Sequence, residues 1–238
     1  MEKIEIIPAI VHALSIPIKI DSGNLYVATA CFVAIILFLF SLLAWKKLRN
    51  TDKCVIPSKK ASVAGIFELT VESILHMMEG IVGPKAKDYF PIIGASFIYI
   101  LVSNLIGIIP GFVPPTSNIN TNAACALCVF VYYNYVGIKR LGFIKYLKTM
   151  AGPVIWLAPL ILVIEVISHI VRPVSLSIRL FGNMFGDHIV IEMFSDLVPM
   201  LIPVIFMGLA VFISFIQAFV FSLLSCIYIG LAISEEGH

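Results

Sequence analysis

The stretch LYVATACFVAIILFLFSLLAW, residues 25–45, decides the fold class, because no charged residue interrupts it. An α-helix of about 20 predominantly apolar residues spans the hydrocarbon core of a bilayer. The run ends in Lys46, Lys47 and Arg49, and short basic loops stay on the cytoplasmic side of a membrane. We therefore predict a first transmembrane span with its N-terminal end outside and its C-terminal end in the cytoplasm.

The composition of the whole chain agrees with a protein that is largely surrounded by lipid. Of its 238 residues 60% are hydrophobic and only 13% are charged, whereas soluble domains are nearer to half apolar and a quarter charged. No basic stripe with interleaved aromatic residues occurs, so nucleic acid is not an expected partner. Nucleotide-binding and hydrolase motifs are also absent from the sequence, and no cofactor, metal or catalytic residue is expected.

Later apolar runs predict further spans over residues 90–109, 121–138, 153–194 and 200–233. Basic residues concentrate in 46–60, 85–87 and 139–148, which places those segments and the C-terminus in the cytoplasm. Residues 63–83 have a different pattern, because three glutamates and a histidine recur on one helical face while apolar residues fill the other: Glu68, Glu72, His76 and Glu79. That pattern is typical of an amphipathic helix on the membrane surface.

The sequence therefore predicts an all-α integral membrane protein with about five transmembrane helices and one interfacial helix. It forms a single domain over 1–238, with residues 1–24 outside. The last two segments are too long for upright spans, because about 41 residues at about 1.5 Å each give roughly 60 Å, against a hydrocarbon core of about 30 Å. They either break or tilt, and a tilted hairpin is the arrangement we expect.

A stripe of polar side chains marks one face of the fourth predicted span. Spacings of three and four place its members within about 120° of one another on a helix: Glu165, Ser168, His169, Arg172, Ser175, Arg179, Asn183 and Asp187. An arginine at the centre of a membrane costs about 2.5–3.5 kcal/mol on insertion scales. Because ionisable residues inside a membrane are functional by default, this stripe is the candidate site.

Arg179 is the most telling member, because apolar sequence surrounds it and arginine keeps its charge in proteins. Such a charge can attract a carboxylate on a partner and repel a passing cation. The alternative is a structural ion pair with Asp187 or Glu165. Glu165 lies 14 positions away, which is about 21 Å along a helix and too far for a direct pair.

Other polar residues suggest a path for protons. Glu165 and His169 lie one helical turn apart near the cytoplasmic end, either lining a proton path or forming a local hydrogen-bonded pair. His188 and Glu192 have the same spacing near the outer end, and imidazole suits a proton relay. Gln217 in the last span needs a partner in lipid, and Arg179 or Asn183 would satisfy it. Helix association without a transport role is the alternative.

The stretch RPVSLSIRLFGNM, residues 172–184, resembles the a-subunit family of F-type ATP synthases. Two more stretches resemble it, PTSNINTN at 115–122 and IQAFVFSLLSCIY at 216–228, and the resemblance is strong from about residue 90 onward. It implies that Arg179 is the stator arginine, with Asn183 and Gln217 close to it. It also implies that Glu165 lies towards the cytoplasmic half-channel.

The same resemblance implies that Asn120 lies near the outer half-channel. His188 occupies a position where some family members carry Glu and others His. Members with Glu there often carry a His on the last helix, and that position is Ala210 here. Glu192 and Asp187 are therefore the alternative partners in the outer proton relay.

The resemblance further implies the partners and the location. The partners would be the c-ring, the peripheral-stalk b subunits and other ATP synthase subunits, and the location a bacterial plasma membrane. The subunit would pass protons through two half-channels and catalyse nothing by itself. A secondary transporter with a central arginine for an anionic substrate is the second possibility, but it predicts internal repeats, which the sequence lacks. A purely structural scaffold is the third.

Overall fold

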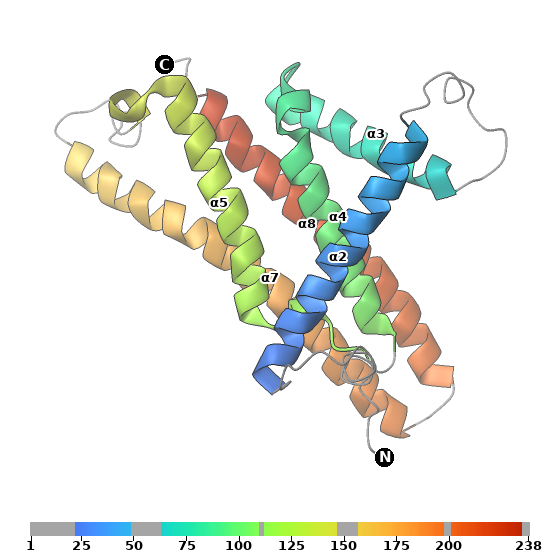
Figure 1. Cartoon of the computed structure of the whole chain (residues 1–238). Coiled ribbons are helices and arrows are strands. Elements are labelled where there is room, and N and C mark those ends of the chain that lie inside the picture. The colour runs from blue at the N-terminus through green and yellow to red at the C-terminus, as the bar shows by residue number, and fades with distance from the viewer. Residues whose placement is uncertain (1–21, 49–62, 110–111, 147–156, 198–200, 235–238) are drawn as a thin grey trace.

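A computed structural model describes residues 22–48, 63–109, 112–146, 157–197 and 201–234. Within these ranges the chain is helical and contains no β-strand. Its main elements, all visible in Figure 1, are α2 (Ser22–Leu48), α3 (Val63–Val82), α4 (Ala86–Ile108), η2 (Pro115–Ser117), α5 (Ile119–Leu141), α7 (Ala158–Leu197) and α8 (Leu201–Ser234). Five of them, α2, α4, α5, α7 and α8, are long and apolar enough to cross a membrane. The predicted all-α membrane fold is confirmed.

The ends of several helices follow from local sequence. Asn118 precedes α5, and its side-chain oxygen accepts a hydrogen bond of 2.8 Å from the backbone N–H of Asn120, which is a helix N-cap. Gly142 ends α5 with a φ of 80°, a left-handed conformation that glycine adopts without steric cost. Its N–H donates to the carbonyl of Ile138 at 2.8 Å. These two signals fix the length of α5.

The packed interior lies where α4, α5, α7 and α8 meet. α4 packs most extensively against α8, and α5 against α7. Fully buried apolar residues from these four helices and from α3 form one cluster, in which the largest side chains are Tyr133, Phe97, Phe221, Met78, Ile93, Ile100, Leu180 and Ile229. Many large apolar side chains on the outside of α2, α7 and α8 are exposed in the isolated chain. Such a surface is suited to lipid or to another membrane protein.

The amphipathic pattern of α3 is confirmed by burial. The polar residues Glu68, Glu72, His76 and Glu79 are all exposed, whereas Ile74 and Met78 are buried. The buried side of α3 packs against α4 and α8, and Figure 1 shows α3 lying across the end of the bundle where α4 begins. The apolar face of α3 is therefore covered partly by protein, while its interfacial position in a membrane stays a prediction.

The last two helices form the expected hairpin. α7 has 40 residues and α8 has 34, which at about 1.5 Å per residue gives roughly 60 Å and 50 Å. Pro173 lies inside α7, and the helix continues through it. Figure 1 shows α7 and α8 running antiparallel and crossing the other helices obliquely. The sequence left open whether these segments break or tilt, and the structure has long continuous helices.

Candidate functional site

Arg179 lies on the outside of α7 and is exposed in the isolated chain. The next residue, Leu180, is fully buried, whereas Ile178 is 54% exposed, so the arginine belongs to the outward side of the helix. Among the described residues nothing forms a hydrogen bond or ion pair with its guanidinium group. The predicted alternative, a pair with Asp187 or Glu165, is therefore not found there. This apolar surface carries a charge that lacks a counter-ion within the described ranges.

One turn further along α7, Asn183 contacts the last helix. Its Nδ2 atom donates a hydrogen bond of 2.6 Å to Oε1 of Gln217 on α8. Gln217 is only 4% exposed, and its neighbour on the same side of α8, Ser214, is also buried. A buried amide needs a partner, particularly in a membrane. The predicted proximity of Gln217 to Asn183 is thus observed, and it joins α7 to α8 beside Arg179.

The half of the polar stripe that is nearer to the N-terminal end of α7 forms a compact charged cluster. Nη2 of Arg172 lies 3.3 Å from Oε1 of Glu165, in both ion-pair and hydrogen-bond contact. Nδ1 of His169 lies 3.4 Å from the same oxygen. All three side chains are half-buried. Glu165 therefore has its counter-ion within α7, and that counter-ion is Arg172 rather than Arg179.

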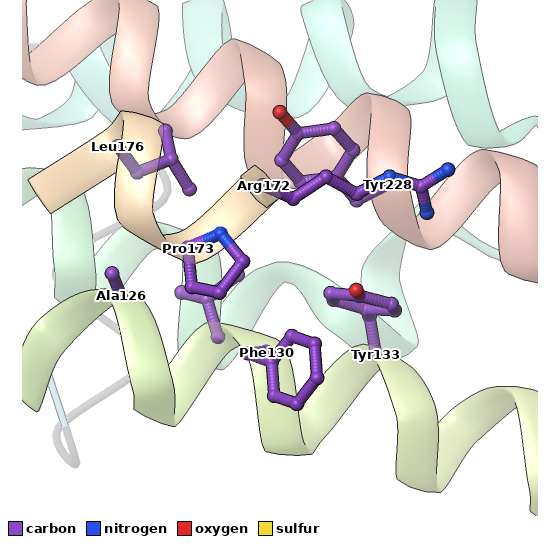
Figure 2. A pocket seen from close by; sticks show the side chains of 8 residues that line it. Ala126, Phe130, Tyr133, Arg172, Pro173, Leu176 and Tyr228 are labelled. Atoms are coloured by element: carbon purple, nitrogen blue, oxygen red, sulfur yellow. The ribbon is translucent and has the colours of Figure 1, made fainter. Parts of the chain in front are cut away.

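Aromatic side chains from α5 and α8 surround the cluster. The guanidinium carbon of Arg172 lies 5.4 Å from the centroid of the Tyr228 ring, within the range of a cation–π contact. Figure 2 shows Arg172 beside Tyr228, with Tyr133 facing both and Pro173 facing Phe130. These side chains line a narrow crevice between α5, α7 and α8, together with Ala126, Val129 and Leu176.

His169 is held from its other side by residues that sequence reasoning missed. Nε2 of His169 lies 3.2 Å from the hydroxyl of Tyr146. That hydroxyl donates a hydrogen bond of 2.8 Å to Oδ1 of Asn134. Ring centroids of Tyr133 and His169 are 5.8 Å apart. The local pairing of Glu165 with His169 was one of the two predicted possibilities, and the structure extends it into a longer polar network.

The residues predicted for the outer half-channel are less closely connected. Asn120 lies exposed in the first turn of α5, whereas Asp187 and His188 on α7 are half-buried. Glu192 also lies in α7, but its side chain is outside the described parts. Ala210 on α8 is buried. The structure places the three α7 residues within two helical turns of one another.

Another polar group near this end also escaped the sequence reasoning. The Nδ2 atom of Asn122 donates a hydrogen bond of 2.7 Å to the backbone carbonyl of Thr116, inside the bundle. Asn122 and Asn104 are almost fully buried, and the described parts of the chain offer no hydrogen-bond partner to their side-chain oxygens. The available signal was that every residue of 116–122 except Ile119 is polar, but this does not tell which side chains point inward.

Comparison with known proteins gives one family for nearly the entire chain. Residues 27–230 match the family model described as ATP synthase A chain. ATP synthase subunit a of Geobacter sulfurreducens is 45% identical over 218 residues, which cover 92% of this chain and 91% of that protein. The subunit a of Geotalea daltonii is 45% identical, with 95% of both chains covered.

A third relative, ATP synthase subunit a 2 of Syntrophotalea carbinolica, is 52% identical over 172 residues, covering 72% of this chain and 73% of the relative. The match to the family model covers all of α7 and α8 as far as Gly230, and it therefore includes Arg179, Asn183 and Gln217. Five membrane-spanning helices, a polar stripe along the fourth of them and these matches agree with one another. The chain belongs to the ATP synthase A chain family.

Proposed function

We propose that this chain carries protons through the membrane sector of a bacterial ATP synthase, by two half-channels that Arg179 keeps apart. Membership of the family makes it a multi-pass membrane component of that complex. The two half-channels, the arginine barrier and the non-catalytic nature of the subunit are the proposed part. The observation that carries the proposal is the exposed charge of Arg179 on the apolar outer side of α7, for which the described residues provide no counter-ion.

A permanent charge facing lipid is costly, and it becomes favourable when a partner supplies a carboxylate. We infer that the c-ring supplies this group and that it passes Arg179 as the ring turns. The large apolar side chains on the same outer surface fit a membrane-embedded partner, and they include Val171, Val174, Ile178 and Phe185. The b subunits of the peripheral stalk would contact other surfaces of the chain.

The proposed path has an outer and an inner part. Outside, a proton enters near Asn120, His188, Asp187 and Glu192 and neutralises the ring carboxylate. Inside, the carboxylate releases its proton past Glu165 and His169. Arg179 lies between the two groups along α7, and Asn183 and Gln217 support it by linking α7 to α8. A charge that crosses the membrane gains about 2.3 kcal/mol per 100 mV.

The distribution of basic residues supports the orientation of the chain. The segments 46–60 and 139–148 hold most of the lysines and arginines, and basic loops remain cytoplasmic. An odd number of spans then places the N-terminus outside and the C-terminus in the cytoplasm of a bacterial plasma membrane. An anion transporter would hold its central arginine in a cavity between helices, whereas Arg179 is on the outer surface of α7.

The test is ATP-driven proton pumping in membrane vesicles that carry Arg179→Ala. The amount of assembled complex is measured in parallel. We expect pumping to be lost while assembly is retained, and passive proton leak to rise because the barrier is gone. Coupled pumping at the native rate in this variant would sink the proposal.

A further inference from the structure

Tyr146 occupies a slot that two glycines create at the end of α5. Gly142 turns the chain with its φ of 80°, and the N–H of Tyr146 donates to the carbonyl of Gly142 at 3.0 Å. Phe143 and Ile144 are exposed, at 62% and 82%, whereas Tyr146 is only 6% exposed. A Cβ atom on Gly137 would lie 2.7 Å from Cε2 of the tyrosine ring. The ring therefore lies directly against backbone and reaches inward to α7.

The hydrogen bonds of this tyrosine have a fixed direction. The Nδ2 atom of Asn134 donates a hydrogen bond of 2.8 Å to the carbonyl of Phe130. This bond orients the amide so that Oδ1 faces Tyr146. The hydroxyl proton of Tyr146 is then used in the bond to Oδ1. A hydroxyl has one proton to donate, so its oxygen can only accept from Nε2 of His169, 3.2 Å away. Nε2 must therefore carry a proton.

The other ring nitrogen of His169 faces an acidic group. Nδ1 is buried and has no hydrogen-bond partner among the described residues, and Oε1 of Glu165 lies 3.4 Å from it. A bare Nδ1 and a carboxylate are both acceptors, so a single proton placed between them satisfies both. This proton resides either on Glu165 or on Nδ1.

Among the described residues, the titratable and charged groups around the imidazole come from three helices and one turn. α7 contributes Glu165 and Arg172, α5 contributes Tyr133, and the turn after α5 contributes Tyr146. On α8, Tyr228 contacts both Arg172 and Tyr133. Arg172 keeps its charge and compensates the carboxylate when the shared proton is absent. Glu165 is thus the only acid in this set.

We propose that Tyr146 is a positioning residue for proton release, which holds the proton on Nε2 of His169 so that exchange with Glu165 runs only through Nδ1. This inference rests on the proposed function and assigns a role to a residue outside the polar stripe. One proton is bound and one is released in each cycle. A proton from the ring carboxylate binds Glu165, moves to Nδ1 to leave a carboxylate and an imidazolium, and returns to Glu165. It then leaves for cytoplasmic water from this carboxyl group, whose side chain is 32% exposed against 12% for His169. The Nε2 proton stays in place throughout.

The experiment measures ATP-driven pumping in inverted membrane vesicles, in which the bath sets the pH on the cytoplasmic side. Initial rates are divided by the uncoupled ATPase rate and recorded against bath pH. The variants are Tyr146→Phe, which keeps the ring in its slot, His169→Gln, and the double variant. Tyr135→Phe is the matched control, because it removes a hydroxyl from a 57% exposed tyrosine on α5, the helix that precedes Tyr146.

We expect Tyr146→Phe to slow pumping about fivefold, the factor for one net hydrogen bond, and to alter the pH profile as His169→Gln does. The double variant should be no slower than the His169 variant alone, because both changes remove the same interaction. Tyr135→Phe should reproduce the native profile.

Three results would overturn the inference. They are a Tyr146→Phe profile that coincides with that of Tyr135→Phe, additive effects in the double variant, and loss of the assembled complex with Tyr146→Phe, since the hydroxyl would then be structural. A native Tyr146→Phe profile alongside an inactive Arg179→Ala variant would remove this inference only. Normal pumping by Arg179→Ala would instead remove the proposed function.

Discussion

Two arginines on α7, seven residues apart, have opposite surroundings. Arg172 is half-buried, pairs with Glu165 at 3.3 Å and lies over the ring of Tyr228. Arg179 is exposed and, within the described ranges, has no counter-ion. The charge of Arg172 is used for packing within the chain, whereas that of Arg179 remains available to a partner. Exposure and pairing therefore separate a structural charge from a candidate functional one on the same helix.

The largest expected effect comes from replacing Arg179 by lysine, and the same replacement of Arg172 is the comparison. Lysine keeps the charge but lacks the planar fork of donors. We expect Arg179→Lys to lower ATP-driven pumping by about 100-fold or more, the usual loss when a positioned electrostatic group is removed. Thermal stability of the assembled complex should not change. If Arg172→Lys lost as much pumping as Arg179→Lys, the contrast between the two sites would be broken.

Close packing, rather than charge, holds the C-terminal half of α7. A Cβ atom on Gly107 of α4 would lie 2.6 Å from Cβ of Pro114 and 2.7 Å from Cε of Met184 on α7. Gly107→Ala should therefore destabilise the subunit by about 3 kcal/mol, near the upper end for overpacking. Thermal denaturation of the purified complex measures this. Gly80→Ala is the control, because nothing lies within 4 Å of its added carbon; equal stability of the two variants would contradict the packing.

Removing the structural arginine should have a smaller effect on stability. Arg172→Ala deletes a charged hydrogen bond to Glu165 and the contact with Tyr228. We expect a loss of about 1.5–3 kcal/mol, the range for hydrogen bonds to charged groups. Thermal denaturation again provides the measurement, and Arg179→Ala should leave the midpoint unchanged. A lower midpoint for the Arg179 variant would indicate that its charge is also structural.

The smallest expected effect concerns the link between α7 and α8. Gln217→Leu removes the acceptor of the 2.6 Å hydrogen bond from Asn183. Interhelical hydrogen bonds in membranes contribute about 0.6 kcal/mol on average in double-mutant cycles. A cycle with Asn183→Leu, read by thermal denaturation, should give a coupling of that size. A coupling of zero would mean that the contact does not hold the hairpin together.

Much of the fold could be predicted because hydrophobic length and helical period are local properties. The apolar run at 25–45 predicted α2, and the glutamate spacing in 63–83 predicted the amphipathic α3. The nearness of Asn183 to Gln217 was also expected, since an amide in a membrane needs a partner. These features depend on the residue and its neighbours in sequence.

The contacts of the charged cluster formed by Glu165, His169 and Arg172 could not be predicted in the same way. Tyr146 reaches His169 across 23 positions, and Arg172 reaches Tyr228 on another helix. Such contacts depend on how helices are rotated about their axes and how closely glycines let them approach. Periodicity placed eight residues on one broad face of α7, but it did not tell which part of that face is covered by α5 and α8.

The difference in polarity between α7 and α8 bears on how the protein is made. α8 has no charged residue from Leu201 to Ser234, whereas α7 carries both arginines and several acids. A charged helix enters a bilayer poorly by itself, and only three residues separate the end of α7 from the start of α8. We expect α7 to settle in the membrane only after synthesis of α8. A chain truncated near residue 200, which lacks α8, should therefore insert its fourth span poorly.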